Sequence, residues 1–313
     1  MFVDNNVCLS QARNTAYLYA SYLKGVLSDI YGNPRRALEE YLKLKQKEQV
    51  PNIDLRMAID YIKIRKYSNA ANILERMCRD TTINAEAYVL LSLTYAAWGK
   101  KLKAEAVYEE FLHRLYALYP ENIKVAEALA ELQLKKGNLA AAEKIYLSLL
   151  AKNQKSVSVY LGLAYIYDEK KEMSRAITLL KEALSRNPDN PELLNSLAYI
   201  YAEAGINLDK AEVMVKKALE RKPNAAAYLD SLGWIYYRKQ VYELALKYLE
   251  QASKLSDDPL IKEHLGDVLY ALGRYSQAIR CWRQIINIKG FPAVRRQVLE
   301  EKIKQARHEQ RKK

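Results

Sequence analysis

The chain has few phenylalanines and no long apolar run. Only 3 Phe stand against 25 Tyr in 313 residues. Tyrosine joins an aromatic ring to a polar hydroxyl, so it suits half-buried positions where the ring packs and the hydroxyl reaches water. Nothing in the sequence approaches the roughly 18 consecutive apolar residues of a membrane-spanning helix. The composition is therefore typical of a soluble protein with many half-buried positions.

Cysteine and histidine are too few and too scattered to predict a catalytic or metal site. The cysteines form neither a disulfide framework nor a metal-binding pair: they are Cys8, Cys78 and Cys281. The histidines lack Ser, Asp or Cys partners at a recognisable spacing: they are His113, His264 and His308. Glu263 and Asp267 flank His264, but two ligands on one helix face are too few for a metal ion. We expect His264 at the surface or in a groove.

A glycine-rich phosphate loop is also missing, because the 10 glycines fall mostly at repeat positions. Together with the scattered histidines, this absence argues against an enzyme. We predict no catalytic residue, no cofactor, no metal and no small-molecule substrate.

Positive charge is concentrated at one end of the chain. The formal net charge is +13. Residues 291–313 hold eight Lys and Arg against three Glu, whereas residues 157–258 are nearly balanced. A basic tail on a neutral middle differs from a uniformly basic protein, so the high isoelectric point alone does not indicate a nucleic-acid partner.

The first eight residues, from Met1 to Cys8, do not resemble a signal peptide. They contain neither a basic region nor an apolar stretch. Cys8 also lacks the small preceding residue of a bacterial lipoprotein cleavage site. Two compartments fit the sequence: the cytoplasm, or the periplasm and outer membrane if a leader has been removed. In the second case the membrane is reached only through a lipid anchor absent from this chain.

Comparison of the chain with itself reveals eight units of about 34 residues. One column of the alignment holds only small residues: Gly25, Ala58, Ser92, Ala130, Ala164, Ala198, Gly233 and Gly266. A second column holds eight alanines: Ala37, Ala70, Ala104, Ala142, Ala176, Ala211, Ala245 and Ala278. Small residues let facing helices approach closely, and each unit carries two apolar stripes of helical period. The sequence therefore predicts eight helical hairpins.

A 34-residue helical hairpin with these columns resembles the tetratricopeptide repeat (TPR). The resemblance implies an all-α, right-handed superhelical solenoid of about eight repeats with a C-terminal capping helix. Residues 1–17 form an extension that includes the start of the first helix, and residues 291–313 form the basic capping helix and tail. The third repeat carries extra residues around His113–Tyr119, which predict a longer second helix. The eight repeats are expected at 18–50, 51–84, 85–122, 123–156, 157–190, 191–225, 226–258 and 259–290.

A narrower resemblance covers residues 191–290. The segments AEAGINLDKAEVMVKKALERKP, YLDSLGWIYYR and DPLIKEHLGDVLYALGR resemble bacterial cell-envelope TPR proteins. Several of these are outer-membrane lipoprotein adaptors, including one type that tethers a C-terminal processing protease near cell-wall hydrolases. The resemblance implies an envelope adaptor whose partner is a protease or a cell-wall enzyme.

In the TPR family the first helix of each hairpin lines the concave surface. The resemblance therefore implies an acidic and aromatic groove in the C-terminal repeats. Rigid aromatic side chains and a single sign of charge suit a partner segment that carries basic and apolar side chains. The residues expected to bind this segment are Tyr165, Asp168, Glu169, Asn195, Tyr199, Asp230, Trp234, Tyr237, Glu263, Asp267 and Tyr270. An alternative is that the aromatic rings pack between neighbouring first helices, more so for Tyr165 and Tyr199 than for Trp234 and Tyr237.

The N-terminal repeats are expected to present a more apolar groove. An apolar patch of this kind indicates a protein contact, including self-association, although ordinary core packing in less regular repeats is equally consistent. The residues expected to face inward there include Tyr19, Tyr22, Leu55, Ile59, Ile62 and Leu93.

The sequence thus favours a non-enzymatic scaffold or adaptor that binds a partner protein. A second class is an RNA-binding helical repeat protein, because the isoelectric point is near 9.3. Against that class, the basic residues lie in the tail and not along the groove. A cytoplasmic assembly cofactor is a further alternative.

Overall fold

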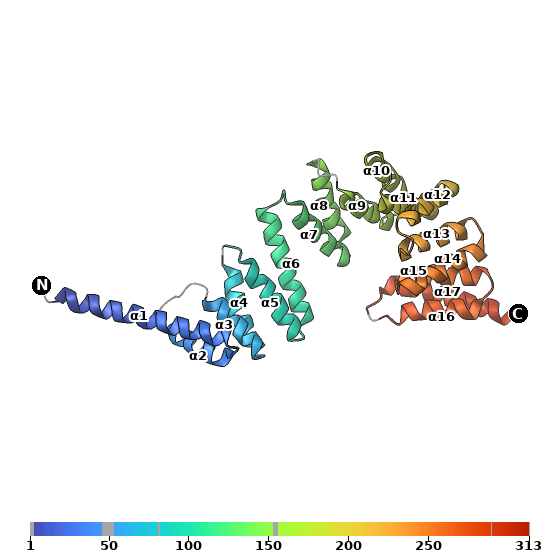
Figure 1. Cartoon of the computed structure of the whole chain (residues 1–313). Coiled ribbons are helices and arrows are strands. Elements are labelled where there is room, and N and C mark those ends of the chain that lie inside the picture. The colour runs from blue at the N-terminus through green and yellow to red at the C-terminus, as the bar shows by residue number, and fades with distance from the viewer. Residues whose placement is uncertain (1–2, 46–52, 81, 153–155, 289, 313) are drawn as a thin grey trace. The chain divides into compact units, whose positions relative to one another are not determined.

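The computed structural model describes residues 3–45, 53–80, 82–152, 156–288 and 290–312. Over these residues it contains α-helices and no β-strand, so the all-α fold expected from the sequence is confirmed (Figure 1). The helices are α1 (Val3–Ile30), α2 (Pro34–Lys45), α3 (Ile53–Lys63), α4 (Tyr67–Arg79), α5 (Ala85–Ala97), α6 (Lys101–Leu118), α7 (Ile123–Lys135), α8 (Leu139–Ala151), α9 (Val157–Glu169), α10 (Met173–Arg186), α11 (Pro191–Ala204), α12 (Leu208–Arg221), α13 (Ala226–Arg238), α14 (Tyr242–Leu255), α15 (Pro259–Ala271), α16 (Tyr275–Ile286) and α17 (Ala293–Lys312).

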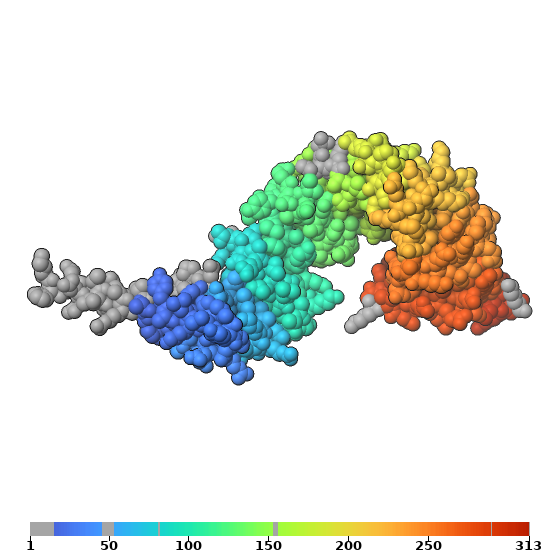
Figure 2. All heavy atoms as spheres, in the orientation of Figure 1, coloured from blue at the N-terminus to red at the C-terminus, as the bar shows by residue number. Residues whose placement is uncertain are grey.

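The helices form antiparallel hairpins in two compact units, unit 1 (Met1–Lys136) and unit 2 (Gly137–Lys313). In unit 1, α1 packs on α2, α3 on α4 and α5 on α6. In unit 2, the pairs are α9 with α10, α11 with α12, α13 with α14, and α15 with α16. Successive first helices also touch within unit 2, since α11 contacts both α9 and α13, and α13 contacts α15. Each unit is therefore a short solenoid. Figure 2 shows that the side chains of neighbouring helices in unit 2 leave no wide gap between them on the visible face.

Polar side chains fix the point where the first helix of most hairpins begins. Asn84, Asn122, Ser156 and Asn190 each accept a hydrogen bond from a backbone N–H in the first turn of the helix that follows. Asp258 does the same for α15. Each of these caps pairs a donor that the start of a helix would otherwise leave unsatisfied.

A residue in the left-handed region lies between the two helices of most hairpins. Gly99 has φ of 75° and Gly273 has φ of 70°. Where the sequence offers no glycine, Lys171 and Gln240 adopt φ of 60°. This conformation ends the first helix and reverses the chain, which explains how the polar stretch around Lys171 can replace a glycine.

The two columns of small residues lie in the core. All eight alanines of the second column are buried. Two glycines of the first column, Gly25 and Gly266, face large rings on the second helix of the same hairpin, and Gly233 faces Leu249. A Cβ on Gly25 would lie 2.3 Å from Cε1 of Tyr41, and a Cβ on Gly266 would lie 2.3 Å from Nε1 of Trp282. Small and large side chains therefore alternate to fill the space between paired helices.

Helix α17 covers the exposed side of the last hairpin. It packs on α16, and its buried residues are Leu299, Ile303 and Ala306. Their spacing puts them on one face of the helix, while Val294 and Val298 stay exposed. Within the described ranges, no helix is both long enough and apolar enough to cross a membrane.

Helix α6 is the longest second helix, with 18 residues against 13 in α4 and α8. The sequence predicts this difference from the extra residues of the third repeat. Each of the eight expected repeat ranges contains two helices, with α1 beginning at Val3, ahead of the first range. In seven of the ranges the two helices pack on each other, whereas α7 and α8 of the range 123–156 belong to different units.

Candidate functional site

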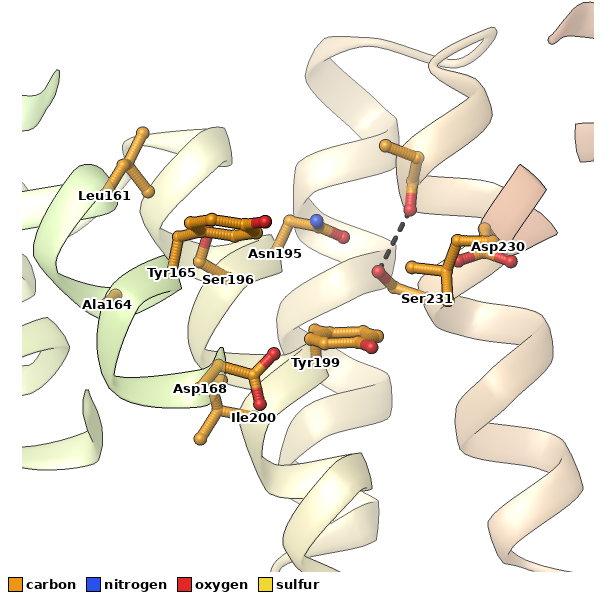
Figure 3. Close-up of a pocket in the computed structure, with 12 residues that line it drawn as sticks. Leu161, Ala164, Tyr165, Asp168, Asn195, Ser196, Tyr199, Ile200, Asp230 and Ser231 are labelled. Atoms are coloured by element: carbon orange, nitrogen blue, oxygen red, sulfur yellow. Dashed lines mark hydrogen bonds between the residues drawn. The ribbon is translucent and has the colours of Figure 1, made fainter. Parts of the chain in front are cut away.

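A pocket opens on the first-helix face of unit 2, between α9, α11 and α13. Its volume is about 200 Å³, and one residue of α15 closes its edge. Figure 3 shows the lining side chains of the three helices turned toward a shared space. The lining residues are Leu161, Ala164, Tyr165, Asp168, Asn195, Ser196, Tyr199, Ile200, Ala227, Asp230, Ser231 and Leu260.

Two tyrosine rings form walls of this pocket. Tyr165 of α9 is 49% exposed, and Tyr199 of α11 is half-buried. Burial raises the pKa of the Tyr199 hydroxyl, and the carboxylates of Glu203 and Asp168 raise it further. Tyr165 also has a raised pKa, chiefly because of burial. Both rings therefore stay neutral at physiological pH and offer their faces and hydroxyls to a ligand.

Two polar atoms in the pocket lack a hydrogen-bond partner. Oδ1 of Asp168 and Oδ1 of Asn195 are buried and accept no hydrogen bond from the part of the chain that the structure describes. Burial raises the pKa of the Asp168 carboxyl, and Glu203 and Glu169 raise it further while Lys171 lowers it. A buried acceptor without a donor costs about 1–3 kcal/mol. Both atoms would gain from a ligand that donates hydrogen bonds.

Beside the pocket lies a buried polar cluster formed by Asp230, His264, Trp234 and Glu203. Oδ1 of Asp230 lies 2.9 Å from Nδ1 of His264, and each residue is only 4% exposed. The Trp234 ring stacks on the imidazole with a centroid separation of 4.1 Å, and its Nε1 donates to Oε1 of Glu203 at 2.6 Å. Burial lowers the pKa of His264, but the carboxylates of Asp230, Asp267 and Glu203 outweigh burial, so the net shift is upward. His264 and Asp230 are therefore paired with each other inside the protein.

This cluster corrects two expectations from the sequence. Trp234 and His264 were expected to face the groove or the surface, but Trp234 is only 9% exposed and His264 is buried beneath it. Asp230 lines the pocket wall, yet its carboxylate is already committed to His264. The expected order is also reversed for one pair of rings, because Tyr165 is far more exposed than Trp234, whereas Tyr199 and Tyr237 are both half-buried. Stacking of the indole on the imidazole accounts for the burial of both.

Two further acidic residues of the expected groove are paired within the chain. Nζ of Lys302, on α17, lies 3.0 Å from Oε1 of Glu263 and 2.8 Å from both carboxylate oxygens of Asp267. Arg295 also reaches Glu263, at 3.2 Å. Burial lowers the pKa of Lys302, but Asp267 and Glu263 raise it more, so the ammonium stays charged. The acidic side chains of the last repeat are therefore neutralised by the cap.

The remaining expected residues lie around these two centres. Glu169 is exposed at the C-terminal end of α9. Tyr237 stacks on Trp234 with a centroid separation of 4.7 Å, and Tyr270 lies 6.0 Å from the Trp282 ring. The structure thus brings five of the expected residues to one pocket: Tyr165, Asp168, Asn195, Tyr199 and Asp230.

Sequence reasoning missed several lining residues and the partners on α17. Leu161 and Ser196 lie on the same helix faces as Tyr165 and Tyr199, so helical spacing could have found them. Lys302 and Arg295 carried no such signal, because their pairing depends on how α17 packs. In the described part of the chain, no group of three or more His, Cys, Asp and Glu is placed to hold a metal ion.

The first-helix face of unit 1 has a different character. Nζ of Lys63 lies 3.2 Å from Oδ1 of Asp29 and 3.0 Å from Oδ1 of Asp60, and Tyr41 donates to Asp29 at 2.8 Å. Tyr19 and Leu93, expected to face an apolar groove, are exposed. The charged groups here are largely paired with one another.

Comparison with known proteins identifies the repeats. Family models of the tetratricopeptide repeat match residues 85–112, 127–191, 169–235 and 228–263. No curated protein matches the chain. Among solved structures, a tetratricopeptide repeat protein from Parabacteroides merdae is 18% identical, with a TM-score of 0.49, over 81% of this chain and 99% of its own.

A second solved structure, yeast Tom70, is also 18% identical, with a TM-score of 0.51 over 88% of this chain. This chain spans 61% of the Tom70 chain. A mutant of MamA is 19% identical over 50% of this chain and 92% of its own, with a TM-score of 0.37. At these identities the likeness shows the fold alone. The repeat matches and the hairpin architecture together show that the chain is a tetratricopeptide repeat protein.

Proposed function

We propose that the chain is a non-enzymatic interaction scaffold that binds a basic or amphipathic segment of a partner protein on α9, α11 and α13. The observation that carries this proposal is the pair of buried acceptors, Oδ1 of Asp168 and Oδ1 of Asn195, at an open pocket. Such atoms are stabilised when a ligand supplies donors. Side chains with donors and positive charge are therefore favoured over acidic ones.

The surroundings of the pocket support the same ligand. Glu169 and Glu203 lie near Asp168 and add negative potential, since both raise its pKa. Tyr165 offers an exposed aromatic ring, which can bury apolar side chains of the segment at a low cost in conformational entropy. Electrostatic complementarity of this kind would steer a basic segment into the groove and reject an acidic one.

A selected peptide tests the proposal directly. A random peptide library would be selected against the full chain, and the most enriched peptide would be labelled and titrated by fluorescence anisotropy. We expect it to carry basic and apolar residues. Asp168→Lys should weaken its binding at least about tenfold, ~1.4 kcal/mol, because a cation would then face a cation.

Glu220→Lys is the matched control. It makes the same change in charge on α12, which does not line the pocket, and Glu220 is exposed. Circular dichroism should show equal helicity in both variants. Equal weakening by both variants, or no effect of Asp168→Lys, would rule out the groove as the binding site.

The source of the segment follows from the narrower resemblance of residues 191–290 to envelope adaptors. On that basis the partner is a protease or a cell-wall enzyme in a bacterial envelope complex. Co-purification of such an enzyme with the wild-type chain, and its loss with Asp168→Lys, would support this partner. A partner retained by both proteins would contradict it.

A further inference from the structure

We infer that the pocket between α9, α11 and α13 receives a guanidinium group, so that the partner segment inserts an arginine side chain there. The inference rests on the proposed function and adds the side chain that the pocket recognises. The pocket has room for a side chain, since about 200 Å³ far exceeds the roughly 30 Å³ of one water molecule.

The hydrogen-bonding capacity of the pocket points to a group that only donates. Asp168 on α9 and Asn195 on α11 each present an unpaired acceptor. An arginine side chain has five N–H donors and no acceptor, and a lysine has three. The two acceptors lie on different helices, so a planar fork that donates in several directions suits them. A compact ammonium concentrates its donors on one atom.

The walls of the pocket suit a planar cation. Figure 3 shows the ring of Tyr165 extending from α9 toward Asn195, and the carboxylate of Asp168 lying beside the ring of Tyr199. A guanidinium plane can lie against a tyrosine face while its edge donates to a carboxylate. The two tyrosines and the two acceptors therefore offer both kinds of contact in one space.

The negative charge of the pocket is not neutralised by a basic residue in its lining. None of the lining residues, all of which the structure describes, is Lys or Arg. The described cations that lower the pKa values of Asp168 and Tyr199 are Lys171, which is exposed on the turn after α9, and Arg295 of α17. Arg295 is engaged with Glu263. Asp168 thus has negative neighbours, and among the described residues no cation forms an ion pair with it.

The chain uses the same chemistry for its own arginines. The guanidinium carbon of Arg175 lies 4.2 Å from the ring centroid of Tyr167, and its Nη2 donates to the hydroxyl at 3.0 Å. Arg114 packs on Tyr88 in the same way, with Nη1 donating to the hydroxyl at 2.8 Å. In both cases the arginine contacts the ring face and the hydroxyl of one tyrosine. No arginine among the described residues stacks on Tyr165 or Tyr199 in this way.

A small probe tests the inference without the partner. N-acetyl-arginine amide would be titrated into the full chain and followed by NMR through the side-chain amide signals of Asn195. We expect saturable shifts that N-acetyl-citrulline amide, its neutral planar analogue, does not produce. Asp168→Asn should abolish the shifts, whereas Glu220→Gln should leave them unchanged. Equal shifts from arginine and citrulline would overturn the inference.

The selected peptide gives a second readout. Replacing its pocket arginine by lysine should weaken binding about fivefold, and replacing it by citrulline about thirtyfold, because charge-assisted bidentate hydrogen bonds are lost. In Asp168→Asn both losses should shrink to less than about threefold, as expected for coupled partners.

The two proposals fail in different ways. If lysine peptides bind as tightly as arginine peptides, or if groove-dependent peptides carry no basic residue, the guanidinium assignment is overturned while the binding groove stands. If no peptide responds to substitutions in the pocket and the arginine probe gives no shifts, both proposals are overturned.

Discussion

The first helices of the two units carry acidic side chains in different states. In unit 1 the carboxylates of Asp29 and Asp60 face Lys63 and Tyr41, which belong to the same unit. In unit 2 the carboxylate of Asp168 opens into a pocket with one oxygen unpaired. The same hairpin scaffold therefore holds carboxylates bound by Lys63 and Tyr41 in unit 1, and a carboxylate with an unpaired oxygen beside a pocket in unit 2.

Unit 1 does contain one buried unpaired oxygen, Oδ2 of Asp60. Burial and the neighbouring Asp29 carboxylate raise the pKa of Asp60 to about 7, while the pKa of Asp29 is lowered. A proton on Asp60 lets it donate to Asp29, so this oxygen can be satisfied by protonation. In the described part of unit 2, Oδ1 of Asp168 is buried beside a pocket and has no hydrogen-bond partner, so it is the atom at which we propose that a ligand binds.

The largest effect should come from the framework that both units share. Gly25→Ala in unit 1 and Gly266→Ala in unit 2 each place a Cβ 2.3 Å from a packed ring. Each should lower the free energy of unfolding of its unit by about 1–3 kcal/mol, as overpacking does. Urea unfolding followed through Trp98 for unit 1 and Trp282 for unit 2 measures both.

Ser92→Ala, in the same column, keeps a Cβ and serves as the control. It loses the hydrogen bond from Ser92 to the Ala104 carbonyl and should cost about 1 kcal/mol. If Gly266→Ala were harmless while Gly25→Ala was not, the two units would not share one packing rule.

The next largest loss of stability should come from removing the cation that pairs with the acidic side chains of the last repeat, because a carboxylate there would then be unpaired, as Asp168 is at the pocket. Lys302→Met removes the cation that Glu263 and Asp267 share, which leaves Asp267 without its ion pair and Glu263 with Arg295 alone. Unit 2 should lose about 1–3 kcal/mol of stability near neutral pH. The loss should shrink as pH falls, because protonation removes the uncompensated charges. Thermal unfolding at several pH values checks this.

Lys304→Met is the control for that change. Lys304 is exposed on α17 and its ion pair is with Glu301 on the same helix, so its loss should cost less than about 0.5 kcal/mol. Equal losses from both substitutions would show that the pairing of Lys302 adds nothing to the fold.

A smaller effect should appear in the pH dependence of unit 1. Folding raises the pKa of Asp60 from its usual 3.8 to about 7, so the folded state binds more protons than the unfolded chain between these two pH values. The contribution of Asp60 is therefore present at low pH and is lost as pH rises through about 7. Asp60→Asn should become more stable relative to wild type by about 1–2 kcal/mol between about pH 4 and pH 8.

Unfolding followed through Trp98 at both pH values gives that difference. The charged neighbours Asp29, Lys63 and Arg56 stay in place in the variant. A constant difference between wild type and Asp60→Asn across this range would contradict the raised pKa.

The smallest change in stability should come from the exposed tyrosines. Tyr165→Ala and Tyr19→Ala should each alter stability by less than about 0.5 kcal/mol, since both rings are largely exposed. Only Tyr165→Ala should weaken the selected peptide. If Tyr19→Ala weakened it equally, the binding surface would not be confined to unit 2.

Local sequence signals predicted the hairpins well. The alanine column depends on nearest-neighbour packing within one hairpin, and all eight of its members are buried. Tyr165, Asp168, Asn195 and Tyr199 meet at one pocket because their spacing on α9 and α11 is fixed by the repeat.

The failures concern contacts that the repeat does not fix. His264 is buried because the Trp234 ring covers it and Asp230 pairs with it, and both lie on the neighbouring α13. Glu263 and Asp267 are paired because α17 brings Lys302 against α15. Neither arrangement can be seen in one repeat, because each depends on the side chains of a second helix.

The contact between α17 and α15 gives a rule for changing the number of repeats. Lys302 binds two carboxylates on α15, those of Glu263 and Asp267. A hairpin inserted ahead of α17 must carry acidic residues at these two positions, or the ammonium will be buried without a counter-ion. A copy of the hairpin of α13 and α14 would not serve unchanged. With Gly233 aligned to Gly266, Asp230 stands at the position of Glu263, but Trp234 stands at the position of Asp267 and cannot pair with the ammonium. Chimeras of different length could thus be ranked in advance by whether the helix that α17 contacts through Lys302 carries acidic residues at these two positions.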